Sequence, residues 1–260
     1  MTTVSTRTGP AYQQRLPVQR FGRNPGAELV LYCFPHAGGN GAAYQPWTAL
    51  VPGTVDVRSV RLPGRPGHLE DDPFTDLRGL AAALAGVVAQ DAAGTPFVLF
   101  GHSMGALLAF EVARELRRSH APQPLRLALS GTSAAHRRTP LAPVHTLGDD
   151  ELVAAVSALG GLPDEVAACP ELLELLLPSL RADFAMVHGY RYEEQAPLAV
   201  PFSVFGGSDD ERVPAADLGG WAELTSARCS VRTHPGGHFY LGEFAADVVA
   251  GILTDLGSAQ

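Results

Sequence analysis

The chain contains 260 residues, of which 46% are hydrophobic and 18% are charged, so it can bury a substantial apolar core. This composition excludes a disordered protein and a small domain that depends on disulfides. Its 27 acidic residues outnumber its 19 basic residues and the net charge is −8, so we expect no nucleic-acid partner, because phosphate contacts require a basic face.

The predicted elements begin after a polar N-terminal arm that spans residues 1–27. Short apolar runs predict buried strands, and the segments between them space their apolar residues as one face of a helix does. The strands are predicted at residues 28–34, 55–62, 96–100, 125–129, 200–205 and 229–233. The helices are predicted at residues 42–50, 75–90, 106–118, 215–224 and 243–256. This alternation predicts an α/β fold with a mostly parallel central sheet and helices on both of its faces.

A long insertion interrupts the alternation at residues 133–196, where no strand is predicted. Two or three helices fit this stretch, at residues 149–159, 171–177 and 180–190. We expect the insertion to be a helical lid over the carboxyl edge of the sheet, with a small packing subdomain that has no gating role as the alternative. The α/β core is then formed by residues 28–132 together with residues 197–260.

Cysteine usage and the N-terminal segment bear on the compartment. The three cysteines, Cys33, Cys169 and Cys229, form no CxxC pair and cannot all pair with one another, which is typical of a reduced cytoplasmic protein. Residues 1–20 include basic side chains but no apolar segment like that of a signal peptide. No stretch reaches the roughly 18 uninterrupted apolar residues that a spanning helix needs, so we also expect no membrane contact.

The strongest chemical signal is the sequence Gly101-His102-Ser103-Met104-Gly105, which stands between a predicted apolar strand and a predicted helix. A sharp strand-to-helix turn of this kind exposes a serine hydroxyl at a helix N-terminus, where the helix dipole favours developing negative charge. Side chains at the two flanking positions would collide with neighbouring backbone, which explains the glycines. The motif predicts Ser103 as a catalytic nucleophile, and a plain glycine-flanked turn is the alternative.

A serine nucleophile needs a base, and the base needs an orienting acid; in this kind of fold their chain order is serine, acid, histidine. His238 follows two glycines in a tight loop after the last predicted strand, and we favour it over His234, which falls at the strand end. Asp209 and Asp210 both follow the strand at residues 200–205. The loop pattern Gly-x-x-Asp-x-x-x-Pro favours Asp210 as the acid, and Asp209 is then a loop-capping residue.

Backbone N–H groups near Ser103 are the candidates for an oxyanion hole. The residue after the serine, Met104, supplies one donor, and the glycine-rich loop after the first core strand supplies the other, for which Ala37 is the candidate. His36 and His102 lie next to these donors, and we expect them to position other groups through side-chain hydrogen bonds.

A metal site is the alternative use of the two C-terminal histidines. His234 and His238 have His-x3-His spacing, but Cys229 is the only further ligand at useful spacing. We therefore expect no metal, and serine chemistry of this kind requires no cofactor.

Together these motifs resemble one known family. FPHAGG at residues 34–39, GHSMG at 101–105, GG-x-DD at 206–210 and PGGHFYL at 235–241 resemble the type II thioesterases of modular polyketide and non-ribosomal peptide synthesis. The lid segment with Arg181-Ala182-Asp183 and the LPGR sequence at residues 62–65 resemble them too, and the likeness extends over residues 28–256. One departure follows LPGR, where the family usually continues with charged residues and this chain has Pro66-Gly67-His68-Leu69.

The resemblance implies an α/β-hydrolase fold and a stand-alone hydrolase that releases aberrant or stalled acyl groups from the phosphopantetheine arm of acyl or peptidyl carrier proteins. Ser103 would be the nucleophile, His238 the base and Asp210 its orienting acid, with the insertion as a lid beside the acyl and pantetheine channels. A monomer is expected. The alternatives are a small-ester hydrolase or lipase with the same triad, and a non-catalytic ligand-binding homologue.

Overall fold

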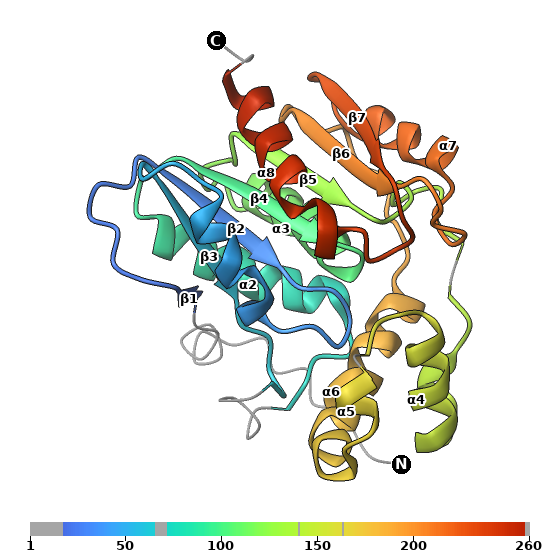
Figure 1. The fold of residues 1–260 in the computed structure, drawn as a ribbon. Coiled ribbons are helices and arrows are strands. Elements are labelled where there is room, and N and C mark those ends of the chain that lie inside the picture. Colours follow the sequence, from blue (N-terminus) through green and yellow to red (C-terminus); the bar gives the residue numbers. More distant parts are fainter. Residues whose placement is uncertain (1–17, 66–71, 140, 163, 258–260) are drawn as a thin grey trace.

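The computed structural model describes residues 18–65, 72–139, 141–162 and 164–257. Within them, one central sheet has the strand order β1-β3-β2-β4-β5-β6-β7 (Figure 1). β1 runs antiparallel to β3, and every other neighbouring pair is parallel, which confirms the predicted mostly parallel sheet. The strands are β1 (Val18–Arg20), β2 (Leu29–Phe34), β3 (Val55–Val60), β4 (Phe97–His102), β5 (Arg126–Ser130), β6 (Phe202–Gly207) and β7 (Cys229–His234).

The strand register brings several loops to one edge of the sheet. Phe34 at the end of β2 pairs with Gly101 near the end of β4. Gly207 at the end of β6 pairs with His234 at the end of β7. Since parallel strands share a carboxyl edge, the loops that follow β2, β4, β6 and β7 gather there, where sites of α/β proteins form.

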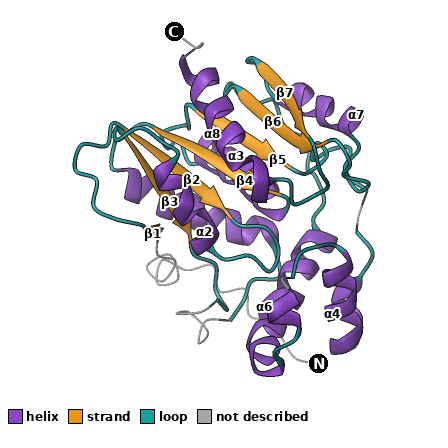
Figure 2. Cartoon of the chain, viewed as in Figure 1, coloured by secondary structure: helices purple, strands orange, loops and turns teal. Residues whose placement is uncertain are grey.

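Helices cover both faces of the sheet because alternate side chains of each strand point to opposite faces. In β2, Val30 and Tyr32 join an apolar cluster with α2 and α3, whereas Leu31 and Cys33 join a second cluster with η1 and α8. Figure 2 shows the strands between these helices. The helices of the core are η1 (Gly41–Ala49), α2 (Leu77–Ala92), α3 (Met104–Arg118), α7 (Ala215–Leu218), η3 (Gly219–Leu224) and α8 (Leu241–Gly257).

The insertion at residues 133–196 is helical, and its described residues contain no strand. Figure 1 shows its helices grouped together at one end of the molecule. Four residues of α4 and α6 form a small apolar cluster of their own, Leu152, Val156, Leu180 and Phe184. The elements of the insertion are η2 (Val144–Thr146), α4 (Asp149–Ala158), α5 (Asp164–Ala167) and α6 (Pro170–Gly189).

Two or three helices were expected in the insertion, and the ranges 171–177 and 180–190 belong to one continuous helix, α6. Pro178 lies inside α6 and removes one backbone donor. Two compensations hold the helix together at this point. Leu180 and Asp183 in the following turn are buried, and Ser179 Oγ donates to Leu176 O at 2.9 Å.

Other segments also differ from expectation in detail. Residues 18–20 of the predicted arm form the short edge strand β1. The helix predicted at residues 42–50 is the 3₁₀ helix η1, and the one predicted at residues 215–224 divides into α7 and η3. The departure at residues 66–69 lies outside the described residues. None of the described helices is both long and apolar enough to cross a bilayer.

Candidate active site

Ser103 occupies a strained turn between β4 and α3. Its φ of 55° and ψ of −116° lie where residues with a side chain are rarely found. Its N–H donates to Ser130 O at 2.8 Å, which fixes the turn against the end of β5. The half-buried Ser103 side chain stands directly before the first residue of α3, Met104, so it lies at the positive end of that helix.

The two glycines of the turn are required by close backbone contacts. A Cβ atom at Gly101 would lie 2.0 Å from Gly105 O. A Cβ atom at Gly105 would lie 2.1 Å from Phe34 O. Both distances are far shorter than a carbon–oxygen contact, so the predicted collision of flanking side chains with backbone is confirmed.

His238 and Asp210 meet across 28 residues of sequence. His238 Nδ1 lies 2.6 Å from Asp210 Oδ2, and Arg212 N–H donates to Asp210 Oδ1 at 3.0 Å. Because an ionised carboxylate only accepts, the proton of the neutral imidazole belongs on Nδ1, which leaves Nε2 as an acceptor. The structure therefore gives His238 the tautomer that a general base needs.

Burial and hydrogen bonding set the ionisation of this pair. Burial raises the pKa of Asp210, but the hydrogen bond with His238 and the charge of Arg212 outweigh it, so the net pKa lies below its usual value. Burial lowers the pKa of His238 below its usual value, although the hydrogen bond with Asp210 opposes the shift. At neutral pH the pair is thus a carboxylate and a neutral imidazole.

The two rival residues have other partners. Asp209 is exposed, and its Oδ2 accepts from Gly236 N–H at 3.1 Å, which is the loop-capping contact expected for it. The ring of His234 stacks on the ring of Tyr240, with 5.6 Å between their centroids. Among the described residues, no group of three His, Cys, Asp or Glu side chains could hold a metal ion.

Ser103 and His238 line the same cavity, together with His36, Ala37 and Phe239. The rest of its lining comes mainly from the insertion and is apolar: Leu141, Val156, Leu159, Gly161, Phe184 and Val187, with Arg212 from the core. The cavity volume is only about 30 Å³, whereas sites for small organic ligands span roughly 300–1,000 Å³. Residues of the segment 133–196 therefore lie close to the serine, with little free space between them.

The candidate oxyanion donors are the N–H groups of Met104 and Ala37. Met104 is the first residue of α3, so its N–H has no partner within the helix. Ala37 lies in a turn in which Gly39 N–H donates to His36 O at 2.9 Å. Ala37 and Ser103 line one cavity, and Met104 directly follows Ser103 in the chain.

Two further histidines of the site, His36 and His102, are neutral at pH 7. Burial lowers the pKa of His36 to about 4 and holds the pKa of His102 well below its usual value. His102 Nδ1 lies 2.9 Å from Ser130 Oγ, which itself lies 2.7 Å from Tyr240 Oη. The expected hydrogen-bonding role of His102 is therefore present, and its ring packs 5.0 Å from the ring of His238.

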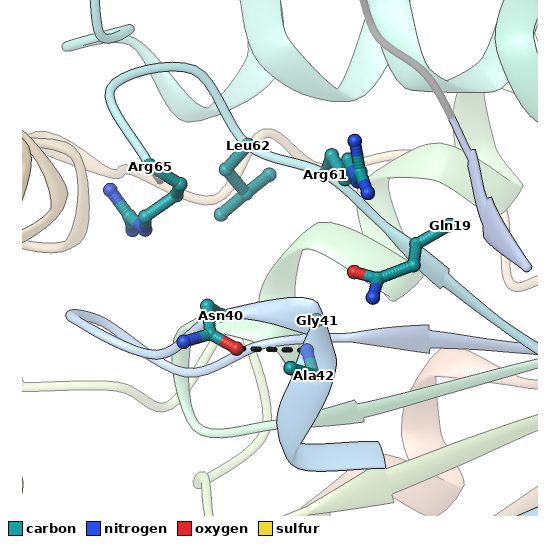
Figure 3. Close-up of a pocket in the computed structure, with 7 residues that line it drawn as sticks. All are labelled: Gln19, Asn40, Gly41, Ala42, Arg61, Leu62 and Arg65. Atoms are coloured by element: carbon teal, nitrogen blue, oxygen red, sulfur yellow. Dashed lines mark hydrogen bonds between the residues drawn. The ribbon is translucent and has the colours of Figure 1, made fainter. Parts of the chain in front are cut away.

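Arg65 ends the LPGR motif and Asp183 lies in the lid segment, and the sequence indicates no role for either residue. In the structure they form a buried ion pair between the loop after β3 and helix α6. Arg65 also borders a second cavity, of about 160 Å³ (Figure 3). That cavity is separate from the one at Ser103 and is lined by Gln19, Asn40, Gly41, Ala42, Arg61, Leu62 and Arg65.

The chain is similar to known proteins along most of its length. The family model for the thioesterase domain matches residues 30–256. The gramicidin S biosynthesis protein GrsT of Aneurinibacillus migulanus is 35% identical over 226 residues, which cover 87% of this chain and 88% of GrsT. The structure of the type II thioesterase BorB from the borrelidin biosynthetic cluster aligns with a TM-score of 0.83 at 35% identity, over 92% of this chain and 96% of BorB. The structure of YbtT, a type II thioesterase from the yersiniabactin NRPS/PKS biosynthetic pathway, aligns with a TM-score of 0.81 at 30% identity, over 93% and 98% of the two chains.

Proposed function

Because this chain belongs to the thioesterase family, we propose that it removes aberrant or stalled acyl groups from the phosphopantetheine arm of acyl or peptidyl carrier proteins in polyketide or non-ribosomal peptide synthesis. The chain is an α/β-hydrolase-fold enzyme that acts on thioesters, as its motifs predicted. Its similarity to GrsT, BorB and YbtT supports the type II, editing role.

One observation carries the mechanism: Ser103 and His238 line one cavity, while Asp210 holds the opposite nitrogen of the imidazole. In our proposal Ser103 is the nucleophile, His238 is the base and Asp210 orients and stabilises the imidazole. The described hydrogen bonds do not include one between the Ser103 hydroxyl and His238. Catalytic hydrogen bonds are often loose without substrate, so this contact is expected to tighten when the thioester binds.

Acylation begins when Ser103 Oγ attacks the thioester carbonyl and its proton passes to Nε2 of His238. The tetrahedral oxyanion that forms accepts hydrogen bonds from Ala37 N–H and Met104 N–H, and the helix dipole of α3 adds to this stabilisation. When this tetrahedral intermediate collapses, the carbon–sulfur bond breaks and the leaving sulfur takes the proton from His238. A thiol with a pKa of about 8.5 is a good leaving group, so this step needs less acid assistance than the loss of an alkoxide.

Deacylation repeats these steps with water. A water molecule gives its proton to His238 Nε2 and attacks the acyl-serine carbonyl, and the same two N–H groups hold the second oxyanion. When the carbon–oxygen bond breaks, Ser103 Oγ recovers the proton from His238 and the free acid leaves. The reaction proceeds with the groups of this chain and requires no metal or cofactor.

The insertion at residues 133–196 is proposed to act as a lid on the core formed by residues 28–132 and 197–260. The cavity of about 30 Å³ cannot admit an acyl chain with its pantetheine arm, so part of the insertion has to move before substrate binds. The apolar lining that the insertion supplies, such as Val156, Phe184 and Val187, fits an acyl chain. We propose that the enzyme works as a cytoplasmic monomer that meets its carrier proteins in solution.

The experiment that tests this function compares the wild type with Ser103→Ala on an acyl-carrier thioester and on the matching oxygen ester. We expect the wild type to have the higher kcat/KM on the thioester, and Ser103→Ala to lose turnover by several orders of magnitude. Normal turnover by Ser103→Ala would exclude Ser103 as the nucleophile. A preference for the oxygen ester would point instead to a small-ester hydrolase, and failure of a fluorophosphonate probe to label Ser103 would point to a ligand-binding homologue.

A further inference from the structure

Asp183 of α6 joins the insertion to the loop that carries Ala37. Its Oδ2 accepts a hydrogen bond from Gly38 N–H at 2.7 Å and a second one from Arg65 Nη2. Arg65 Nε donates to Gly39 O at 3.0 Å. Asp183 and Arg65 are only 2% and 4% exposed. Two buried side chains of opposite charge therefore hold backbone groups of the two residues that follow Ala37.

The orientation of one peptide group depends on this contact. The turn closes through the hydrogen bond from Gly39 N–H to His36 O, and Gly38 has a φ of 77°, which is typical of the third residue of a type II turn. In a type I turn the peptide between Ala37 and Gly38 is rotated by about half a turn, so that Gly38 N–H points to the opposite side. Asp183 accepts from this N–H and so selects the type II form, which holds the C-terminal side of Ala37. The Ala37 N–H itself belongs to the preceding peptide, between His36 and Ala37.

Apolar packing keeps α6 against the same turn. A Cβ atom at Gly38 would lie 2.7 Å from Leu180 Cδ1, so the backbone of the turn lies directly against α6. Leu180 and Asp183 are three residues apart and therefore share one face of the helix. Ala37 itself packs against the apolar cluster of the insertion. Helix α6 thus gives the turn one apolar and one anionic contact.

We propose that Asp183, held by Arg65, is a positioning residue for the oxyanion donor Ala37 N–H. This inference rests on the proposed thioesterase function and goes beyond it, because it assigns the insertion a part in turnover as well as in covering the cavity. An oxyanion donor acts only if it is fixed before the reaction, and a loop with two consecutive glycines, Gly38 and Gly39, does not fix itself. In this proposal α6 therefore helps to hold Ala37 N–H in place, by fixing the peptide that follows Ala37.

The main test removes Asp183, the acceptor for Gly38 N–H, without leaving the charge of Arg65 buried and unpaired. In the double variant Asp183→Leu/Arg65→Met, apolar side chains of similar size replace the ion pair, an exchange that folded proteins often tolerate with little loss of stability. We expect a folded protein with a somewhat lower thermal midpoint, because Gly38 N–H and Gly39 O lose their partners. We also expect a fall in kcat on an acyl-N-acetylcysteamine thioester of about tenfold or more, and a small change in KM. The single variant Asp183→Asn keeps an acceptor but loses the charge, so its kcat should lie between those of the wild type and the double variant.

A pair of inhibitors separates positioning from general loosening. A trifluoromethyl ketone forms an oxyanion with Ser103, whereas a thioether analogue of the substrate does not. The double variant should lose affinity for the ketone by the same factor as kcat and bind the thioether as the wild type does. The control Arg181→Ala removes contacts of α6 with Leu147 O and Asp149 but keeps Leu180 and Asp183, and it should bind both inhibitors normally.

Three outcomes would overturn the inference. One is full kcat and ketone affinity in the folded double variant, or in Asp183→Asn if the double variant does not fold. Another is an equal loss of affinity for both inhibitors. The third is a matching loss of ketone affinity in Arg181→Ala. If the wild type itself fails to hydrolyse the thioester, the proposed function fails instead, so the two failures are distinguishable.

Discussion

The imidazole of His238 and the carboxylate of Asp210 lie 2.6 Å apart, and the side chain of Asp210 is 2% exposed. Such a buried, short contact fixes both the orientation and the tautomer of the imidazole. The adjacent Asp209 is exposed and accepts a hydrogen bond from Gly236 N–H. The two neighbouring aspartates of this loop therefore have different partners. This difference can be tested by matched substitutions.

The first prediction is that Asp210→Asn lowers kcat by about 10³–10⁴-fold, because an amide in place of the carboxylate favours the wrong tautomer of His238. Asp209→Asn is the control. Its kcat should stay within about threefold of the wild-type value, because Asp209 accepts from Gly236 N–H and does not contact the imidazole. Steady-state hydrolysis of one acyl thioester by both folded variants provides the measurement. A larger loss in Asp209→Asn than in Asp210→Asn would reverse the two roles.

The second prediction concerns pH. Because burial lowers the pKa of His238, kcat/KM should rise with pH through a single ionisation below about 6.5 and stay level at neutral pH. The carboxylate of Asp210 opposes that shift, so the residual activity of Asp210→Asn should show its acidic limb at a lower pH than the wild type. The measurement is kcat/KM against pH for both proteins; an acidic limb at higher pH in the variant would contradict the assignment.

The core of the fold follows from the sequence because its signals are local. Apolar runs such as residues 96–100, each followed by a helical pattern, indicate a parallel sheet, and the carboxyl edge of such a sheet is where its loops converge. The turn at Ser103 was predictable for the same reason, since the glycines that it requires lie within two residues. By contrast, β1 consists of only Val18-Gln19-Arg20, which is too short and polar to give a pattern.

Features that depend on contacts between distant segments could not be predicted. Arg65 and Asp183 are 118 residues apart, and neither one's neighbours in sequence indicate that they meet. The continuity of α6 through Pro178 also depends on tertiary packing, because local propensity alone favours a break there. The choice of Asp210 for the contact with His238 could be favoured from the loop pattern, but only coordinates show which carboxylate reaches the imidazole.

The third prediction is that Gly105→Ala strongly lowers turnover. Its Cβ atom would lie 2.1 Å from Phe34 O, and neither backbone segment can move without displacing Ser103 or β2. We expect a loss of at least about a hundredfold in kcat together with a lower thermal midpoint. Gly242→Ala is the matched control, since no atom lies within 4 Å of a Cβ atom there, and it should keep full activity. Wild-type kcat in a folded Gly105→Ala variant would show that the backbone contact is not needed.

A fourth prediction concerns the contribution of Asp255, in the last helix, to the stability of the fold. Asp255 of α8 accepts from Arg232 at 2.6 and 2.7 Å, and from Ser203 and Ser230 at 2.5 Å each, so it ties the last helix to β6 and β7. Burial raises its pKa, but these hydrogen bonds and the charge of Arg232 outweigh burial and lower the net pKa. Replacing Asp255 by Asn would leave Arg232 and the nearby buried Arg126 without their carboxylate.

We expect Asp255→Asn to lower the free energy of unfolding by about 2 kcal/mol at pH 7, measured by urea unfolding. Because the unfolded chain binds the proton of this carboxyl more tightly than the folded chain does, its contribution is fully present above the unfolded pKa of about 3.9 and is lost as the pH falls further. The difference between wild type and variant should therefore shrink below pH 4. Asp247→Asn, at an exposed position of the same helix, should change stability by less than about 0.5 kcal/mol. A deficit of Asp255→Asn that grows on acidification would show that the carboxylate is not held in its ionised form.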